Sequence, residues 1–442
     1  MWAGRSEATL AAAVAPLLAE TPYLCEVNQM SRLRLLPVLA ALLLAACGAP
    51  AAGPAPTVAP AVSEADTQRL PTAAAAPTTT GPAQALAPTL LPEEPPPDGV
   101  GQFTTDFSRH TVPYDEILSG GPPKDGIPAI DVPQFVSVAE ADAWLEPQEP
   151  VVLVEIGDDA RAYPIQVLMW HEIANDTVGG VPVTVTFCPL CNTAIVFDRR
   201  VGERVLDFGT TGRLRYSNLI MYDRQSESWW QQASGEAIVG ELAGAQLRFL
   251  PAAIIAWEEF FTAYPDGQVL SRETGISRDY GRNPYAGYDD VSRPPFLYDG
   301  PATPDALPAT ARVLTVDLGG EAVAYPYEAL AATGAVNDTV GGQPLVVLWQ
   351  AGTASALDAD SVAGGRDVGA AAAYSRVIDG RALTFARDGE RLTDTETGSA
   401  WDVLGRAVDG PLAGAQLQPV VAVNHFWFSW AAFKPETRIY QP

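Results

Sequence analysis

The apolar positions of the chain follow two patterns, one typical of strands and one typical of helices. Short apolar runs separated by turn residues predict strands and hairpins in residues 150–164, 177–187 and 193–209. Apolar residues at helical spacing predict one helix in residues 165–176, closed by its Asn-Asp end, and another in residues 250–267, ended by Pro and Gly. Short strands outnumber helices, so we expect an α+β fold that is mainly antiparallel β with short helices.

The same pattern occurs twice along the chain. In residues 163–180, a Tyr-Pro pair and the run Asn-Asp-Thr-Val-Gly-Gly each return 162 positions later. A second match joins residues 235–251 to residues 405–421, at a spacing of 170 positions. Runs of this length at constant spacing predict two homologous halves, residues 103–300 and 301–442, packed about a pseudo-twofold axis.

The N-terminal part of the sequence predicts an export signal and a lipid anchor. Residues 30–46 hold two arginines, an apolar run of 12 residues that is too short to span a bilayer, and small residues before Cys47. The Leu-Ala-Ala-Cys ending resembles the lipobox of bacterial lipoproteins. We therefore expect lipidation of Cys47 and an extracytoplasmic protein anchored to the cell membrane. Residues 1–29 are interpreted as a gene-start artefact, and residues 47–102, rich in Ala, Pro and Thr, as a disordered tether.

Charge excludes one class of partner. The 442 residues include 53 acidic and 27 basic side chains, for a net charge of −26. Nucleic-acid binding depends on Lys and Arg neutralising phosphates, so we expect no nucleic-acid partner. A hydrophobic content of 47% is ample for a packed core.

Comparison of the two predicted halves indicates which residues could form a reactive site. His171, Cys188 and Cys191 lie within 21 positions, and the second half has Thr333, Gln350 and Thr353 in their places. Two thiols and an imidazole could bind a soft metal ion, copper or zinc, although no fourth ligand is evident. Glu172, which does not recur either, is an acid/base candidate.

The Cys-x-x-Cys pair allows two further interpretations besides metal binding. One is thiol redox chemistry at Cys188 and Cys191, although the residues that follow the pair predict a strand instead of the helix that lowers a thiol pKa in thioredoxin-like sites. The other is a structural disulfide formed in an oxidising compartment. If the protein is an enzyme, these residues favour a metal- or thiol-dependent oxidoreductase.

A second group of residues predicts a ligand site. A loop over residues 270–290 combines Arg and Tyr side chains with turn residues, and arginine binds carboxylates and phosphates through paired hydrogen bonds. The alternative function is therefore a binding protein for a small anionic or sugar-like ligand, with the Cys pair as a staple. The side chains expected to take part are Arg272, Arg278, Tyr280, Asn283, Tyr285, Trp229 and Trp230.

Three motifs together carry a family resemblance. They are His-Glu at 171–172, Cys-Pro-Leu-Cys at 188–191 and Tyr-Gly-x-Asn-Pro-Tyr at 280–285. With them the chain resembles a bacterial family known only as domain of unknown function 3179, over residues 103–298 and, in degenerate form, to the C-terminus. The resemblance implies one domain built around this site and implies no reaction.

Overall fold

The computed structural model describes residues 89–442. The predicted gene-start artefact, the signal peptide, Cys47 and most of the predicted tether lie outside the described residues. Among the described residues, the helices are too short and too polar to cross a membrane.

Strands dominate the first half of the chain, as the apolar pattern predicted. Its helices are α2 (Val138–Ala141), α3 (Ile165–His171), α4 (Trp257–Ala263) and the 3-10 turns η1 (Tyr114–Glu116) and η2 (Pro189–Cys191). Its strands are β1 (Ile117–Ser119), β2 (Phe135–Ser137), β3 (Pro150–Ile156), β4 (Asp159–Pro164), β5 (Ile173–Val178), β6 (Val181–Cys188), β7 (Thr193–Asp198), β8 (Arg200–Val201), β9 (Arg204–Val205), β10 (Phe208–Arg215), β11 (Asn218–Asp223), β12 (Trp229–Gln231), β13 (Glu236–Val239), β14 (Arg248–Leu250), β15 (Ala253–Ala256) and β16 (Gln268–Leu270).

The second half adds α5 (Tyr327–Thr333), α6 (Trp427–Ala431) and the turn η3 (Val362–Gly364). Its strands are β17 (Arg312–Leu318), β18 (Glu321–Pro326), β19 (Ala335–Val340), β20 (Gln343–Gln350), β21 (Ala370–Ser375), β22 (Val377–Ile378), β23 (Arg381–Ala382), β24 (Phe385–Asp388), β25 (Arg391–Asp394), β26 (Ala400–Trp401), β27 (Ala407–Asp409), β28 (Val423–Phe426) and β29 (Arg438–Ile439). Nearly all pairings are antiparallel, so the α+β class with mainly antiparallel strands is confirmed.

The sheets of the two halves follow similar orders. The first half has sheets β15-β3-β4-β16-β2, β14-β7-β6-β5 and β1-β10-β11-β12-β13, and the second has β28-β17-β18-β29, β19-β20-β21 and β24-β25-β26-β27. The strand β16 pairs in parallel with β4, and β29 pairs in parallel with β18. Val152 faces Tyr163 and Ile254, and Leu314, 162 positions later, faces Tyr325 and Asn424 in the same way.

Side-chain hydrogen bonds also recur at matching places. The Tyr163 hydroxyl donates to Asp176, and the Tyr325 hydroxyl donates to Asp338 at 2.8 Å. The indole of Trp230 donates to Asp223 at 2.9 Å, and that of Trp401 donates to Asp394 at 3.0 Å.

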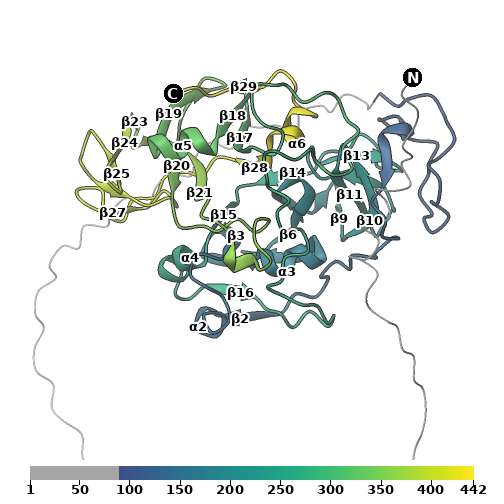
Figure 1. Ribbon diagram of the computed structural model, residues 1–442, viewed down its shortest axis with the longest axis horizontal. Helices are drawn as coiled ribbons and strands as arrows, with labels where there is room; N and C mark the ends of the chain where they lie inside the picture. The colour runs from purple at the N-terminus through teal and green to yellow at the C-terminus, as the bar shows by residue number, and fades with distance from the viewer. Residues whose placement is uncertain (1–88) are drawn as a thin grey trace, which may run out of the picture. The chain divides into compact units, whose positions relative to one another are not determined.

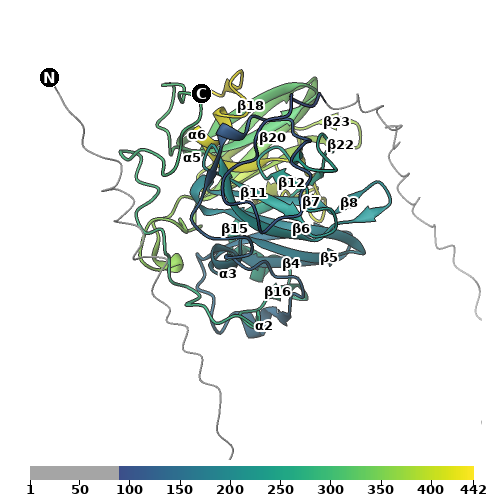
Figure 2. The same ribbon diagram turned by 90° about the vertical axis from the view of Figure 1, so that its right-hand side faces the viewer.

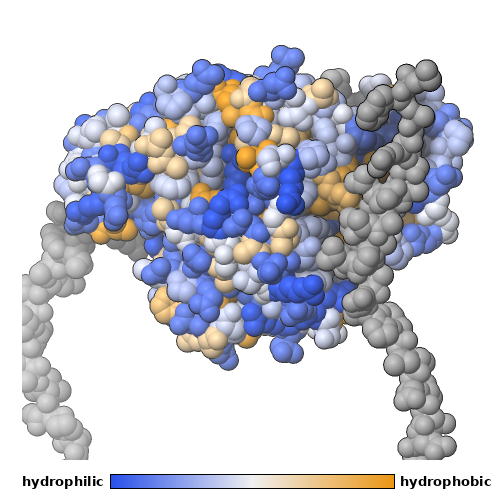
Figure 3. Space-filling view, viewed as in Figure 1, coloured by the Kyte–Doolittle hydropathy of each residue, from blue (hydrophilic) through white to orange (hydrophobic). Residues whose placement is uncertain are grey.

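The core crosses from one half to the other. One apolar cluster joins Leu153 and Ile255 of the first half to Val346 and Leu348 of the second, and another joins Phe187 to the residues of β28 and α6. Figure 1 shows β15 and β3 next to β21, and Figure 2 shows the layered sheets from the side. On the face drawn in Figure 3, hydrophilic residues predominate between small apolar patches.

Two predicted boundaries are wrong. The helix predicted for residues 165–176 ends at His171, because Glu172 has a left-handed backbone and residues 173–178 pair with β6. The helix predicted for residues 250–267 begins only at Trp257, because the residues before it pair with β3.

The start of the folded body is a third correction. The tether was expected to reach residue 102, but Leu91 N–H donates to the His110 carbonyl at 2.9 Å, and Tyr114 N–H donates to the Glu94 carboxylate at 2.7 Å. Val100 packs against an apolar cluster of the body. These contacts attach the segment from residue 91 onwards to the fold.

Asn175 connects two sheets in the first half. Its amide donates to the Phe208 carbonyl at 2.8 Å and accepts from the Phe208 N–H at 3.0 Å, and its side chain is 3% exposed. Asn337 makes the same pair of bonds to Phe385 at 2.7 and 2.8 Å, but at an exposed position. Both asparagines therefore have scaffold roles within strands, although a helix cap or turn was expected.

The two asparagines form a matched pair for a stability test. We expect Asn175→Ala to lower the free energy of unfolding by about 2–4 kcal/mol, since buried backbone groups lose their partners. Asn337→Ala should cost about 0.5–1 kcal/mol, because water can replace the amide. Urea denaturation of both variants measures the difference, and equal costs would contradict this account.

Candidate functional site

The two cysteines lie side by side in the interior. Cys188 ends β6 and Cys191 ends η2, and both are free thiols that are at most 2% exposed. Pro189 starts the 3-10 turn, and Asn192 ends it with a left-handed backbone (φ 49°), so the chain returns as β7. This tight turn directs both sulfurs toward one acceptor, the Ser217 carbonyl, at 3.2 Å from Cys191 Sγ and 3.8 Å from Cys188 Sγ.

The surroundings keep the Cys188 thiol protonated. Burial raises the pKa of Cys188 well above its ordinary value, and the neighbouring Cys191 and Glu172 raise it further. The Asn218 amide donates to Cys191 Sγ at 3.4 Å. At rest Cys188 is thus a neutral thiol and not a thiolate nucleophile.

Glu172 is the acidic group of the site. It follows α3 with φ 57° and ψ −27°, and its counterpart in the second half, Gly334, has φ 73° and ψ −35°. Burial raises the pKa of the Glu172 carboxyl to about 8. A glutamate at a position that favours glycine, with its carboxyl out of water, costs stability twice, which indicates a functional residue.

Backbone strain is concentrated around the thiols. Of the eight non-glycine residues with positive φ among residues 89–442, four surround the pair: Glu172, Asn192, Tyr216 and Ser217. Such residues persist only where the surrounding structure holds them, and they are frequent at functional sites. The clustering points to the same place as the sequence motifs.

His171 does not join the thiols as a ligand. Its Nδ1 lies 2.7 Å from the Pro128 carbonyl, which can only accept, so Nδ1 carries the proton. The Tyr280 hydroxyl, 2.6 Å away, then donates to the free lone pair on Nε2. Burial lowers the pKa of His171, in agreement with a neutral ring.

The predicted ligand set of His171, Cys188 and Cys191 is consequently not assembled. Within the described range, residues 89–442, there is no group of three or more His, Cys, Asp or Glu side chains that could hold a metal ion. The residues as arranged do not fit a zinc site, which needs four ligands. Copper or zinc binding stays a prediction, and it would require His171 to exchange Tyr280 for the metal.

The Arg/Tyr loop covers the thiols, so the two groups of residues that the sequence presented as alternatives form one site. We call residues 271–298 the cover loop. Its Tyr280 contacts His171. Burial raises the pKa of the partly buried Tyr285, and the nearby Glu172 and Cys188 raise it further. Burial also raises the pKa of Tyr288, and the nearby Cys191 and Cys188 add to that effect.

Two predicted ligand residues anchor the cover loop instead. Arg272 donates to Gln166 Oε1 at 2.6 and 2.8 Å and lies over the ring of Trp144 at 4.5 Å. Asn283 donates to the Ala359 carbonyl at 2.8 Å, which ties the loop to the second half. Arg278 differs: it has no carboxylate within salt-bridge distance in the described part of the chain, and its charge helps to lower the pKa of His171.

The two tryptophans are a correction. Trp229 and Trp230 were expected to form a ligand platform, but both are fully buried in β12. Trp229 packs edge-on against Phe103 and Phe107, and the indole of Trp230 donates to Asp223. They are core residues because β12 is an inner strand of its sheet.

The sequence reasoning missed several groups that the fold brings to the site. Ser217 supplies the carbonyl that both thiols contact, and His425 of the second half lies 2.8 Å from the hydroxyl of Thr193, which donates to the Cys191 carbonyl. Asp289, which holds the cover loop to Arg312 at 2.8 Å, was also missed. No motif marks Ser217 or His425, since each comes from a segment distant in the sequence, whereas Asp289 lies within the Arg/Tyr loop and was overlooked there.

The backbone conformation of Glu172 yields a first prediction at this site. We expect Glu172→Gly to raise the free energy of unfolding at pH 7 by about 1 kcal/mol, because strain and a buried carboxyl are both removed. Gly334→Ala should destabilise, since its Cβ would lie 2.6 Å from Arg387 Cδ. Denaturant unfolding measures both, and destabilisation by Glu172→Gly would contradict the strain argument.

A second prediction concerns pH. The folded-state pKa of Glu172 is raised to about 8 from 4.5, so the folded protein binds more protons than the unfolded chain between these values. Stability therefore falls as pH rises from about 4.5 to about 8. Glu172→Gln removes this contribution, and its stability relative to the wild type should grow across that window by roughly 3–5 kcal/mol. A constant difference across the window would refute the buried carboxyl.

Comparison with known proteins places the chain in a family. A family model described as "Protein of unknown function (DUF3179)" matches residues 124–437. No curated protein matches the chain, and no solved structure does. The match covers both halves and includes all three motifs of the site. The chain therefore belongs to the protein family of unknown function DUF3179.

Proposed function

We propose that this protein is a thiol–disulfide oxidoreductase in which Cys188 and Cys191 cycle between dithiol and disulfide. The observation that carries the proposal is the pair of adjacent free thiols beside the buried carboxyl of Glu172. A neutral thiol is a poor nucleophile, and a neighbouring base is what activates it. Glu172, with a pKa of about 8, accepts that proton in its ionised form, whose share grows as the pH rises toward 8.

The reaction needs a disulfide as the oxidant. The Glu172 carboxylate takes the proton of Cys188, and the thiolate attacks one sulfur of the substrate disulfide. The substrate S–S bond breaks, a mixed disulfide forms, and the leaving thiolate receives the proton. Cys191 then attacks Cys188 Sγ, which forms the internal disulfide and releases the second substrate thiol. Two electrons and two protons pass to the substrate.

The cover loop defines the substrate class. The thiols are at most 2% exposed, and Tyr285 and Tyr288 of the loop lie near them, so a large protein disulfide is disfavoured and a small disulfide, admitted by movement of the loop, is favoured. Arg278 lies near His171 without a carboxylate partner among the described residues, and it would attract an anionic group. The substrate we propose is a small anionic disulfide. This unites the redox hypothesis with the anionic-ligand hypothesis from the sequence.

We also infer an extracytoplasmic location and an internal duplication. The location is supported by the signal-like residues 30–46 and by Cys47 as the site of a lipid anchor to the membrane. The duplication is supported by matching ladder positions and by the repeated Tyr–Asp and Trp–Asp hydrogen bonds. Under this inference the second half lost the thiols and kept the scaffold.

The proposed redox cycle can be tested by differential alkylation with mass spectrometry. The reduced full-length protein is mixed with glutathione disulfide, a small anionic disulfide, and the peptide with Cys188 and Cys191 is analysed. We expect an internal disulfide in the wild type, a trapped glutathione adduct on Cys188 in Cys191→Ser, and no reaction at Cys191 in Cys188→Ser. Glu172→Gln should slow oxidation by about 10²-fold.

The controls separate this site from the other cysteines and from metal binding. A Cys25→Ser/Cys47→Ser variant should react like the wild type, and elemental analysis of the same sample reports copper or zinc. If Cys188 and Cys191 stay reduced while the protein is folded, the redox proposal fails. If stoichiometric metal protects both thiols, metal binding replaces it.

A further inference from the structure

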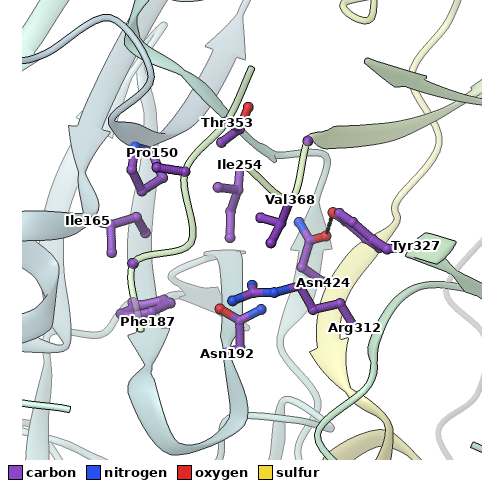
Figure 4. A pocket seen from close by; sticks show the side chains of 13 residues that line it. Pro150, Ile165, Phe187, Asn192, Ile254, Arg312, Tyr327, Thr353, Val368 and Asn424 are labelled. Carbon is purple, nitrogen blue, oxygen red and sulfur yellow. Dashed lines mark hydrogen bonds between the residues drawn. The ribbon is translucent and has the colours of Figure 1, made fainter. Parts of the chain in front are cut away.

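A small cavity lies where the two halves meet, lined in the first half by residues that include Phe187 and Asn192, the sequence neighbours of Cys188 and Cys191. Phe187 lines it, and Phe187 points into a different apolar cluster from that of its neighbour Cys188. Three pairs of matching positions also line it: Pro150 and Arg312 start β3 and β17, Ile165 and Tyr327 start α3 and α5, and Ile254 and Asn424 occupy the same ladder position in β15 and β28. Figure 4 shows these side chains facing one another.

The two walls of the cavity differ in chemistry. At each matching pair the first half supplies an apolar residue and the second half a polar one. Burying a polar side chain costs free energy unless it is hydrogen-bonded. The first half has Pro and Ile at these three positions, so the scaffold does not need polar residues there. The three polar residues of the second half therefore indicate a ligand-binding wall.

The polar wall offers more donors than acceptors. In the described part of the chain, Arg312 Nε and Thr353 Oγ1 are buried without a hydrogen-bond partner. Arg312 Nη2 donates to the Asp289 carboxylate at 2.8 Å and to the Ser355 hydroxyl. These two bonds hold one edge of the guanidinium in place. The Tyr327 hydroxyl donates to Asn424 Oδ1, which leaves the Asn424 amide group as a donor. A matching ligand must supply acceptor oxygens.

We propose that this cavity binds a small carboxylate, with its oxygens toward Arg312, Thr353 and Asn424 and its apolar side toward Ile165 and Ile254. The cavity has a volume of about 20 Å³, which limits the buried part of the ligand to a few heavy atoms. The proposal does not depend on the proposed redox function, since neither cysteine lines the cavity. It gives the second half, which lacks the cysteines, a binding role of its own.

Formate is the probe, used with the full-length protein. Isothermal titration calorimetry with sodium formate, at ionic strength matched with sodium chloride, should show saturable binding of one formate per chain. Thr353→Val should weaken this binding at least tenfold, since a hydrogen bond to a charged ligand is lost. Thr353→Ser, which keeps the hydroxyl, should bind as the wild type does. Thr184→Val is the matched control, because the buried hydroxyl of Thr184 also lacks a partner but lies outside the cavity.

The outcomes decide the proposal in either direction. Saturable formate binding that Thr353→Val weakens and Thr184→Val leaves unchanged supports the site. The double variant Tyr327→Phe/Asn424→Leu, which removes both partners of one hydrogen bond, should weaken binding to a similar extent. Heat signals no larger than those of chloride mean that the cavity holds at most a water, and the proposal fails. Equal binding of neutral formamide, or wild-type affinity in Thr353→Val, would also overturn it.

Discussion

The left-handed backbone of Glu172 is the constraint on which the site depends. It ends α3, reverses the chain into β5 and places a carboxyl next to the end of β6. The Glu172 carbonyl accepts from the Phe187 N–H at 2.8 Å, so the same residue joins the helix end to the strand that carries Cys188. The counterpart Gly334 makes the same reversal without strain, which shows that the fold itself does not require a glutamate.

Burial determines the chemistry of this site more than charge does. The Cys188 thiol, the Glu172 carboxyl and the tyrosines Tyr285 and Tyr288 all have raised pKa values because they are removed from water. The Glu172 carboxyl is therefore mostly protonated at neutral pH, and only its ionised form, which grows as the pH approaches 8, can accept a proton from the neighbouring thiol.

The second half of the chain holds the cover loop of the first half in place. Arg312 and Arg366 hold Asp289 of the cover loop, and the Ala359 carbonyl holds Asn283. Without these contacts the loop would lie over the thiols with few attachments. The second half, which carries no cysteine, therefore fixes the position of the loop that lies near the cysteines of the first.

The sequence by itself determined the α+β class and the repeated pattern, and it singled out His171, Cys188, Cys191 and the Arg/Tyr loop as candidates, because these depend on local periodicity and on comparison within the chain. The tertiary structure decided that the loop covers the thiols, that His171 contacts Tyr280, and that Trp229 and Trp230 are core residues. The reason is physical: which distant segments pack together depends on burying the whole core, and a local pattern of residues carries no information about that choice.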